Sequence, residues 1–546
     1  MTDPRSIPPV IRRPRVVLAA ALAAAACALA GCSTSPGPSA AAAGKPVRGG
    51  TLKVALGPGI TCLDPQQTIS LDARSATRGI AESLTDLDPN TGKIVPWLAK
   101  SWQVNADATR YTFHLATGLT FSDGTPFTAR TVQKNLDYIK DTLGGKALRG
   151  AGYLKNYTGT EVVDDHTAVV RFSRPSIQFL GGTATPAFAM LAESSVQATP
   201  EDRCQGSLVG TGPFTLAGYR QNQSIKLTRR KGYVASSALA RHKGEPYLDG
   251  ISFRIMPVSN VRSGALGSGQ VDVASAVASQ DTQALTARGY RVKAAVQPGL
   301  PGSFFVNVTR PQFKDPAVRQ ALQISLNRAS LVKAVLGARF KPATSVLSST
   351  TPGYRNLSRS LTPDPRMAAS LLDAAGWARG PDGVRAKNGT KLSMTVVYSS
   401  EIGDYYTSLL QLVQRQWKDI GVSVELKDIT QASLAADLAD GDYDLWISSL
   451  TEAEPDVLRT FVGGYHPGQR ELRASGITGL FDTEQAAAQP GERARVFGRI
   501  QQKMIDGALV IPLFESAQLM GASRKVGGLR FEAGAFLSYY DAWIQR

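Results

Sequence analysis

The sequence predicts an α/β protein built as two lobes. Three features indicate this class: the first half mixes strand and helix signals irregularly, the second half alternates them regularly, and the last residues are rich in aromatic side chains. Irregular mixing is typical of α+β packing, and regular alternation with short links predicts a parallel sheet with right-handed crossovers. An aromatic tail should pack back onto the body, so we expect the chain to cross between the lobes more than once.

The first half of the chain carries the irregular pattern. Strand signals recur over 49–56, 111–115 and 167–172. Between the last two, residues 128–143 place apolar side chains on one helical face, at Val132, Leu136, Ile139 and Leu143. We expect a first lobe over residues 49–300, with an extra α+β subdomain inserted at about 75–195.

Two helices of the second half begin at Asp-Pro pairs. Asp315-Pro316 and Asp364-Pro365 each supply an N-cap and a proline at the first helical position. The first of these helices should run toward Gly337 with a break near Asn327. Further strands are expected over 392–398, 422–426, 443–449 and 508–514, and further helices over 404–420 and about 430–441.

The strands of the second half indicate where a ligand would bind. Ligands of parallel sheets lie at the carboxyl ends of the strands, which directs attention to residues 398–401 and 449–455. We expect the second lobe over 301–510. The segment 511–546, with Tyr539, Tyr540 and Trp543 near its end, should return to the first lobe.

The N-terminus has the pattern of an export signal. Basic residues precede a short apolar run that ends in Leu29-Ala30-Gly31-Cys32. The last four residues resemble a bacterial lipobox, in which the cysteine receives a diacylglycerol and becomes the mature N-terminus. We therefore predict a signal over 1–31, a lipid at Cys32, a disordered tether over 32–48, and a place on the extracytoplasmic face of a bacterial membrane. An ordinary secretory signal with a chance cysteine is the alternative, and the choice between general and twin-arginine export stays open.

The net charge of +17 does not indicate nucleic-acid binding. Nucleic-acid interfaces cluster Lys and Arg among aromatic residues, whereas here the basic residues are scattered along the chain. Attraction to an anionic cell envelope accounts for this charge.

The cysteines predict one disulfide. Cys27 leaves with the signal and Cys32 carries the lipid, so Cys62 and Cys204 remain in the body. Outside the cytosol such a pair can be bridged.

No motif for catalysis or metal binding is present in the sequence. The four histidines form no H-E-x-x-H pair, and neither Cys-x-x-Cys nor G-x-S-x-G occurs. We expect no catalytic residues, no metal site and no cofactor.

Several spaced motifs resemble those of one protein family. They are Val95–Trp102 (VPWLAKSW), Gly118–Ala129 (GLTFSDGTPFTA), Gly210–Phe214 (GTGPF), Gly269–Val273 (GQVDV) and Phe313–Leu322. This series is similar to the signature of the family 5 extracellular solute-binding proteins, which serve dipeptide, oligopeptide and nickel ABC importers. The resemblance implies a class II, cluster C fold with a hinge between two lobes. It also implies a monomer that works with an ABC permease and its ATPase.

The same resemblance implies where a peptide would bind. Peptide binders of this family hold the peptide by main-chain hydrogen bonds and pair its ammonium with an Asp in a Trp-x-x-Asp-like segment. Residues 443–456 match this segment but depart from it: depending on the register, Thr451 or Ala453 takes the place of the Asp. Glu452 or Glu454 could bind the ammonium instead, or both could be solvated loop charges. Our candidate ligand-binding residues are Tyr398, Ser399, Trp446, Thr451, Glu452 and Glu454.

The implied function is capture of di- or oligopeptides for import. Three alternatives stay open. The first is the same role for a different solute, such as an oligosaccharide, an opine-like compound or a metal chelate. The second is a surface receptor for a signalling peptide, and the third is an envelope hydrolase.

The lipid anchor gives a first prediction. Cys32→Ala removes the thiol that takes the lipid, so the variant should appear in the medium when cells are fractionated, while the unaltered protein stays with the membranes. A variant that still fractionates with membranes would contradict the anchor.

Overall fold

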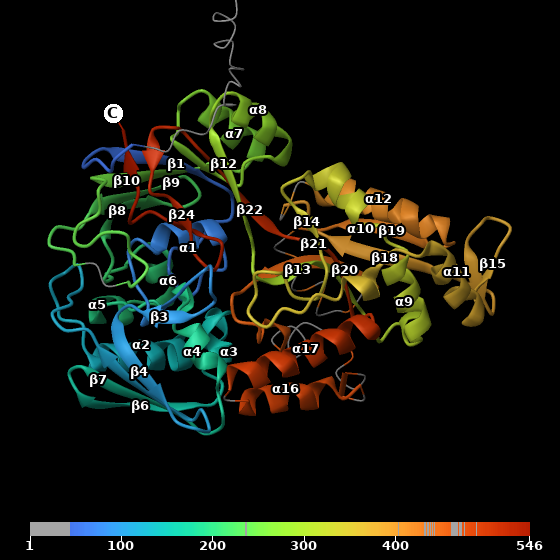
Figure 1. Cartoon of the computed structure of the whole chain (residues 1–546), viewed down its shortest axis with the longest axis horizontal. Helices are drawn as coiled ribbons and strands as arrows, with labels where there is room; N and C mark the ends of the chain where they lie inside the picture. Colours follow the sequence, from blue (N-terminus) through green and yellow to red (C-terminus); the bar gives the residue numbers. More distant parts are fainter. Residues whose placement is uncertain are drawn as a thin grey trace, which may run out of the picture. The chain divides into compact units, whose positions relative to one another are not determined.

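The computed structural model describes residues 44–545. Within this range it leaves out 235–236, 402, 404, 431–432, 434–435, 437, 439–440, 442, 460–467, 469–471, 474 and 488. This part of the chain belongs to one compact unit (Figure 1). The predicted signal, Cys32, most of the tether and most of the helix expected at 430–441 lie outside the described residues.

A seven-stranded mixed sheet forms the centre of the first lobe. Its order is β12 (Arg291–Val296), β22 (Ala517–Ala522), β11 (Val273–Ser275), β1 (Thr51–Leu56), β10 (Gly250–Ile255), β9 (Ser224–Arg229) and β8 (Phe214–Arg220). Strand β1 runs parallel to β10 and β11, and the other pairs are antiparallel. The sheet and helix α1 (Leu71–Thr77) share a core in which Leu52, Val54 and Ala73 are fully buried.

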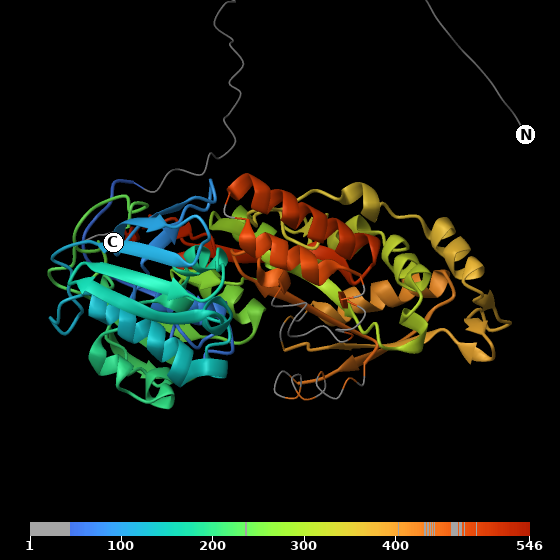
Figure 2. The same cartoon turned by 90° about the horizontal axis from the view of Figure 1, so that it is seen from below.

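The subdomain is an antiparallel sheet covered by a helix (Figure 2). Its strands follow the order β4 (Ala99–Val104), β5 (Arg110–Leu115), β7 (Thr167–Phe172) and β6 (Tyr157–Asp164). Helix α2 (Ala129–Asp137) begins at Thr128, where the backbone N–H donates to the Thr131 hydroxyl at 2.8 Å in a capping box. The strands expected at 111–115 and 167–172 and the helix starting at 128 are thus confirmed.

The second lobe contains a six-stranded sheet. Its order is β14 (Lys341–Pro342), β21 (Val510–Glu515), β13 (Gly299–Val306), β20 (Leu445–Thr451), β18 (Ser393–Tyr398) and β19 (Ser423–Asp428). Strand β18 runs parallel to both β19 and β20, so β18 and β20 end at the same edge, as the alternating pattern predicted. Helix α12 (Tyr406–Asp419) connects β18 to β19.

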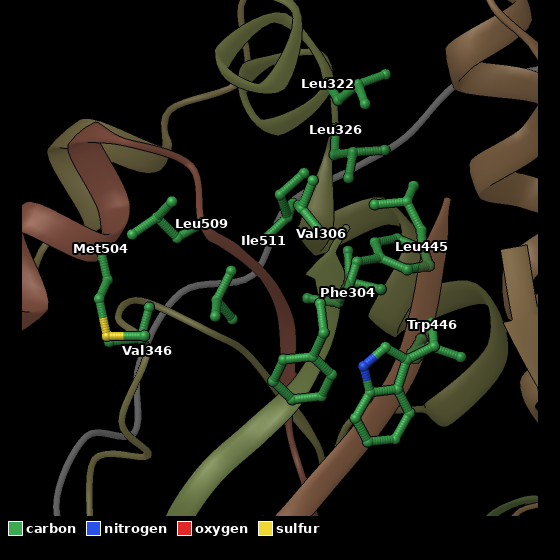
Figure 3. Packing of buried hydrophobic residues seen from close by; sticks show 14 of the residues in the cluster. Phe304, Val306, Leu322, Leu326, Val346, Leu445, Trp446, Met504, Leu509 and Ile511 are labelled. Atoms are coloured by element: carbon green, nitrogen blue, oxygen red, sulfur yellow. The ribbon is translucent and has the colours of Figure 1, made fainter. Parts of the chain in front are cut away.

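Helices cover the second sheet and close its core. Asp315 caps α9 (Pro316–Ile324) and Asp364 caps α11 (Pro365–Ala374), each accepting a backbone N–H. A break follows α9, and α10 (Arg328–Leu331) starts after Asn327 as expected. Figure 3 shows Phe304 and Val306 of β13 among Leu322, Leu326 and Ile511 in this core.

The chain crosses between the two sheets twice. The first crossing lies between β12 and β13, at 297–298, and the second lies between β21 and β22, at Ser516. We expected the return to begin at 511, but β21 pairs with β13 as far as Phe514 and with β14 at Glu515. The apolar run 508–514 indicates a buried strand but not the sheet to which it belongs, so the boundary moves to the end of β21.

A covalent bond and a buried ion pair fix the loop that leads to α1. Cys62 and Cys204 form a disulfide, with an S–S distance of 1.98 Å, between this loop and α6 (Pro200–Cys204). The neighbouring Arg203 is fully buried, donates to Asp64 Oδ1 at 2.9 Å and lies over the Tyr138 ring at 4.3 Å. These contacts hold the start of α1, and with it Arg74, against the subdomain.

Candidate functional site

A small pocket lies where the two lobes meet. Helix α1, the subdomain, the segment after β20 and the returning C-terminal segment all contribute to its wall. Its volume is about 20 Å³, which is about the room of one water molecule. This volume is too small to hold a peptide. Its lining consists of Arg74, Asp86, Leu87, Ala184, Thr185, Pro186, Thr451, Glu452, Ala453, Glu532, Ala533, Gly534 and Phe536.

Glu452 connects the two lobes at the edge of this pocket. It follows β20 directly, and its side chain is buried. Arg149, which precedes α3 (Gly150–Tyr153) in the subdomain, places Nη1 3.2 Å from Glu452 Oε2. The same Nη1 donates to the backbone oxygen of Thr451. Because a buried carboxylate without a partner is strongly unfavourable, this pair stabilises the closed arrangement of the lobes.

Arg78 neutralises the two other acidic residues of the pocket. Its Nε lies 3.0 Å from Glu532 Oε2, and its Nη2 lies 3.6 Å from Asp86 Oδ1. The guanidinium also lies over the Trp97 ring at 4.0 Å. Burial raises the pKa of Asp86, and the nearby Glu532 raises it further. This cluster ties the returning C-terminal segment to the first lobe.

Arg74 lines the pocket one helical turn before Arg78. It is 2% exposed, and its guanidinium lies 5.2 Å from the centre of the Phe536 ring. Among the described residues, its Nε and Nη1 have no hydrogen-bond partner. Burial and the nearby charge of Arg149 lower the pKa of Arg74, against the opposing effect of Glu452, to about 9. The side chain is therefore still charged at neutral pH.

Glu454 belongs to a different network, inside the second lobe. It pairs with Arg493 of α17 (Pro490–Asp506), whose Nε lies 2.6 Å from Glu484 of α16 (Ile477–Ala486). Arg459 links Glu484 to Asp456, at 3.0 and 2.8 Å. Burial raises the pKa of Glu454, and Arg493 opposes this shift. The alternative that Glu452 and Glu454 are solvated loop charges is therefore wrong, since both are buried and ion-paired.

The other candidate residues occupy two kinds of position. Thr451 lines the pocket and donates its hydroxyl to Gln297 Oε1 at 2.7 Å. Tyr398 and Trp446 belong to the core of the second lobe, where the Trp446 ring lies 4.7 Å from Phe305. Ser399 is buried at the end of β18. These three do not line this pocket, and their contact with a ligand stays a prediction.

Some pocket residues carried no signal in the sequence. Arg74, and Arg149 beside the pocket, are single arginines among many scattered basic residues, and Glu452, which pairs with Arg149, lies far from it in the chain. The aromatic tail did indicate that the C-terminal segment returns to the body, but not that Glu532 and Phe536 would reach the pocket. The rule on strand ends, through the range 449–455, and the family resemblance, through residues 443–456, both pointed to this part of the pocket.

The described part of the chain lacks two features. None of its helices has the length and apolar character needed to cross a bilayer. Within the same residues, no group of three or more His, Cys, Asp and Glu side chains is arranged to hold a metal ion.

Comparison with known sequences decides the family. The sequence model of the bacterial extracellular solute-binding proteins, family 5 Middle, matches residues 93–471. The chain belongs to this family. The resemblance seen in the spaced motifs is thereby confirmed, and the protein is a solute-binding component of an ABC importer. The glutathione-binding protein GsiB of Salmonella typhimurium strain LT2 is 27% identical over 503 residues, covering 90% of this chain and 93% of its own.

Solved structures share the fold. NikA from Brucella suis, in complex with Fe(III)-EDTA, superposes with a TM-score of 0.78 at 21% identity, covering 91% of this chain and 100% of its own. The oligopeptide-binding protein AppA from Bacillus subtilis, in complex with a nonapeptide, gives 0.74 at 19% identity, with 92% and 100% covered. The predicted two-lobed α/β fold of the class II periplasmic binding proteins is confirmed.

The ion pair between Arg149 and Glu452 makes a testable prediction about lobe closure. Arg149→Gln leaves Glu452 buried without its cation in the closed form, so the ratio of open to closed molecules should rise at least tenfold, about 1.4 kcal/mol. Fluorescent labels on Val163→Cys and Met367→Cys, both exposed and one in each lobe, report the distance between the lobes.

Lys146 provides the matched control for this measurement. It pairs with Glu201 at 2.6 Å, three residues before Arg149, and both side chains are exposed. Exposed pairs contribute little, so Lys146→Gln should leave the label distance unchanged. Equal distances in the Arg149→Gln and unaltered proteins would show that the pair does not hold the lobes together.

Proposed function

We propose that this protein captures a peptide between its lobes and delivers it to the permease and ATPase of an ABC importer. In this proposal it works as a monomer at the outer face of a bacterial membrane, held by a lipid on Cys32. The observation that carries the proposal is the pocket at the lobe junction, where Arg74 and Glu452 bring opposite charges from the two lobes. A peptide is itself a zwitterion and requires both.

Hinge closure follows from the two crossings of the chain. The segments at 297–298 and at Ser516 are the connections about which the lobes rotate. In the open form a solute reaches the charges of one lobe, and rotation then adds the charges of the other lobe. A solute that contacts both lobes shifts the population toward the closed form by its differential affinity for that form.

Glu452 is the proposed partner of the peptide ammonium. It lines the pocket, whereas Glu454 pairs with Arg493 inside the second lobe. Arg149 contacts Oε2 of Glu452, and Oε1 accepts the backbone N–H of Ala453 at 3.1 Å. When the lobes part, Glu452 loses its contact with the first lobe and becomes accessible to a cationic group.

A metal chelate is the second candidate solute. The structural relative NikA from Brucella suis is seen with Fe(III)-EDTA, and a carboxylate of a chelate could also bind Arg74, which lines this pocket. An opine-like compound would use the same charges. A neutral oligosaccharide fits this pocket less well, because Trp446 and Tyr398, aromatic side chains of the kind that stack on sugars, lie in the core instead. A receptor for a signalling peptide would differ only in having no transporter.

A binding screen tests the solute class. The full chain in detergent is mixed with pooled di- to hexapeptides, with oligosaccharides and with metal chelates, and thermal unfolding is followed. A peptide at 100 times its dissociation constant should stabilise the folded state by about 2.7 kcal/mol. Stabilisation by a sugar or chelate alone would contradict the peptide proposal.

The ammonium anchor gives a mutational test. Glu452→Gln removes the negative charge while keeping the size of the side chain, so peptide affinity measured by calorimetry should fall at least tenfold, about 1.4 kcal/mol. Glu425→Gln, at an exposed position of β19 in the same lobe, is the matched control and should bind as the unaltered protein does. If the two variants bind the peptide with equal affinity, Glu452 does not contact the peptide ammonium.

A further inference from the structure

Arg74 differs from the other charged residues in and around the pocket in lacking a partner. Arg78 pairs with Asp86 and Glu532, and Arg149 pairs with Glu452. The described residues offer no hydrogen-bond acceptor to Nε or Nη1 of Arg74, although its side chain is almost fully buried.

An unpaired guanidinium is unfavourable in such surroundings. Removing a charge from water costs several kcal/mol unless an opposite charge and hydrogen bonds replace the water. The positive charges of Arg149 and Arg78 add to this cost, because each disfavours a second cation nearby. The acidic residues of the pocket are already engaged, so the missing acceptor has to come from outside the chain.

The geometry points to Arg74 as the binding site for a carboxylate of the captured solute. This inference rests on the proposed function and adds the chemical class of the solute, which must carry at least one free carboxylate. The Phe536 ring supports the face of the guanidinium, which leaves the N–H groups at its edge to bind a planar anion. A peptide C-terminus, an acidic peptide side chain and a carboxylate chelate share this chemistry.

Two consequences distinguish this role from a structural one. Replacing Arg74 by a neutral residue should weaken binding of a carboxylate solute, yet the protein without solute should not lose stability, because an unpaired buried charge is removed. Replacing a structural arginine would instead lower the stability of the protein without solute. Loss of the carboxylate from the solute should have the same effect as loss of Arg74, and the two losses should not add.

The test compares trialanine, trialanine amide and Fe(III)-EDTA by calorimetry on the full chain in detergent. We expect the unaltered protein to bind trialanine at least tenfold more tightly than its amide. Arg74→Gln should lose at least tenfold in affinity for trialanine and bind the amide as the unaltered protein does. Its unfolding temperature without solute should be equal or higher. Arg110→Gln, at an exposed position of β5, is the matched control and should leave all affinities unchanged.

Each outcome bears on the inference. Tight binding of Fe(III)-EDTA instead of trialanine, with the same loss in Arg74→Gln, would support the carboxylate site and identify a chelate as its source. Equal affinity for trialanine and its amide would overturn the inference and leave peptide capture standing, and this comparison needs no variant. An Arg74→Gln protein that is less stable, and that loses as much affinity for the amide as for trialanine, would also overturn it. If none of the three probes binds, the proposed function falls and this inference falls with it.

Discussion

The carboxylate of Glu452, buried at the end of a strand of the second lobe, takes its cation from the first lobe. The distance to Arg149 is 3.2 Å, across more than 300 positions of the chain. A buried charge requires a partner, so the two lobes cannot separate without exposing this carboxylate to water or to a solute. The contact between the lobes and the wall of the pocket depend on the same residue, because Glu452 pairs with Arg149 and also lines the pocket.

The rest of the fold positions these charges. The disulfide between Cys62 and Cys204 and the buried pair of Arg203 with Asp64 fix the loop before α1. Helix α1 then carries Arg74 to the pocket and Arg78 to the returning C-terminal segment. On the other side, the parallel arrangement of β18 and β20 places the segment after β20 at the edge of the second sheet. Two segments of the chain connect the two sheets, at 297–298 and at Ser516.

The sequence predicted the elements more completely than the site. Local signals were sufficient where the physical cause is local: Asp315 and Asp364 cap the helices that they were expected to cap, and the alternation of strands and helices predicted the parallel pairing of β18. The range 449–455 was identified from the general behaviour of parallel sheets. By contrast, nothing near Glu452 in the sequence indicates Arg149, because an ion pair between lobes depends on how the lobes meet. Trp446 shows the same limit: its place in the core depends on Phe305 of a distant strand.

The most direct test of this account is the crystal structure of the full chain with a bound carboxylate peptide such as trialanine. The account predicts the peptide between the lobes, with its ammonium beside Glu452 and its carboxylate at the edge of the Arg74 guanidinium. A peptide bound to one lobe alone, away from both residues, would contradict it.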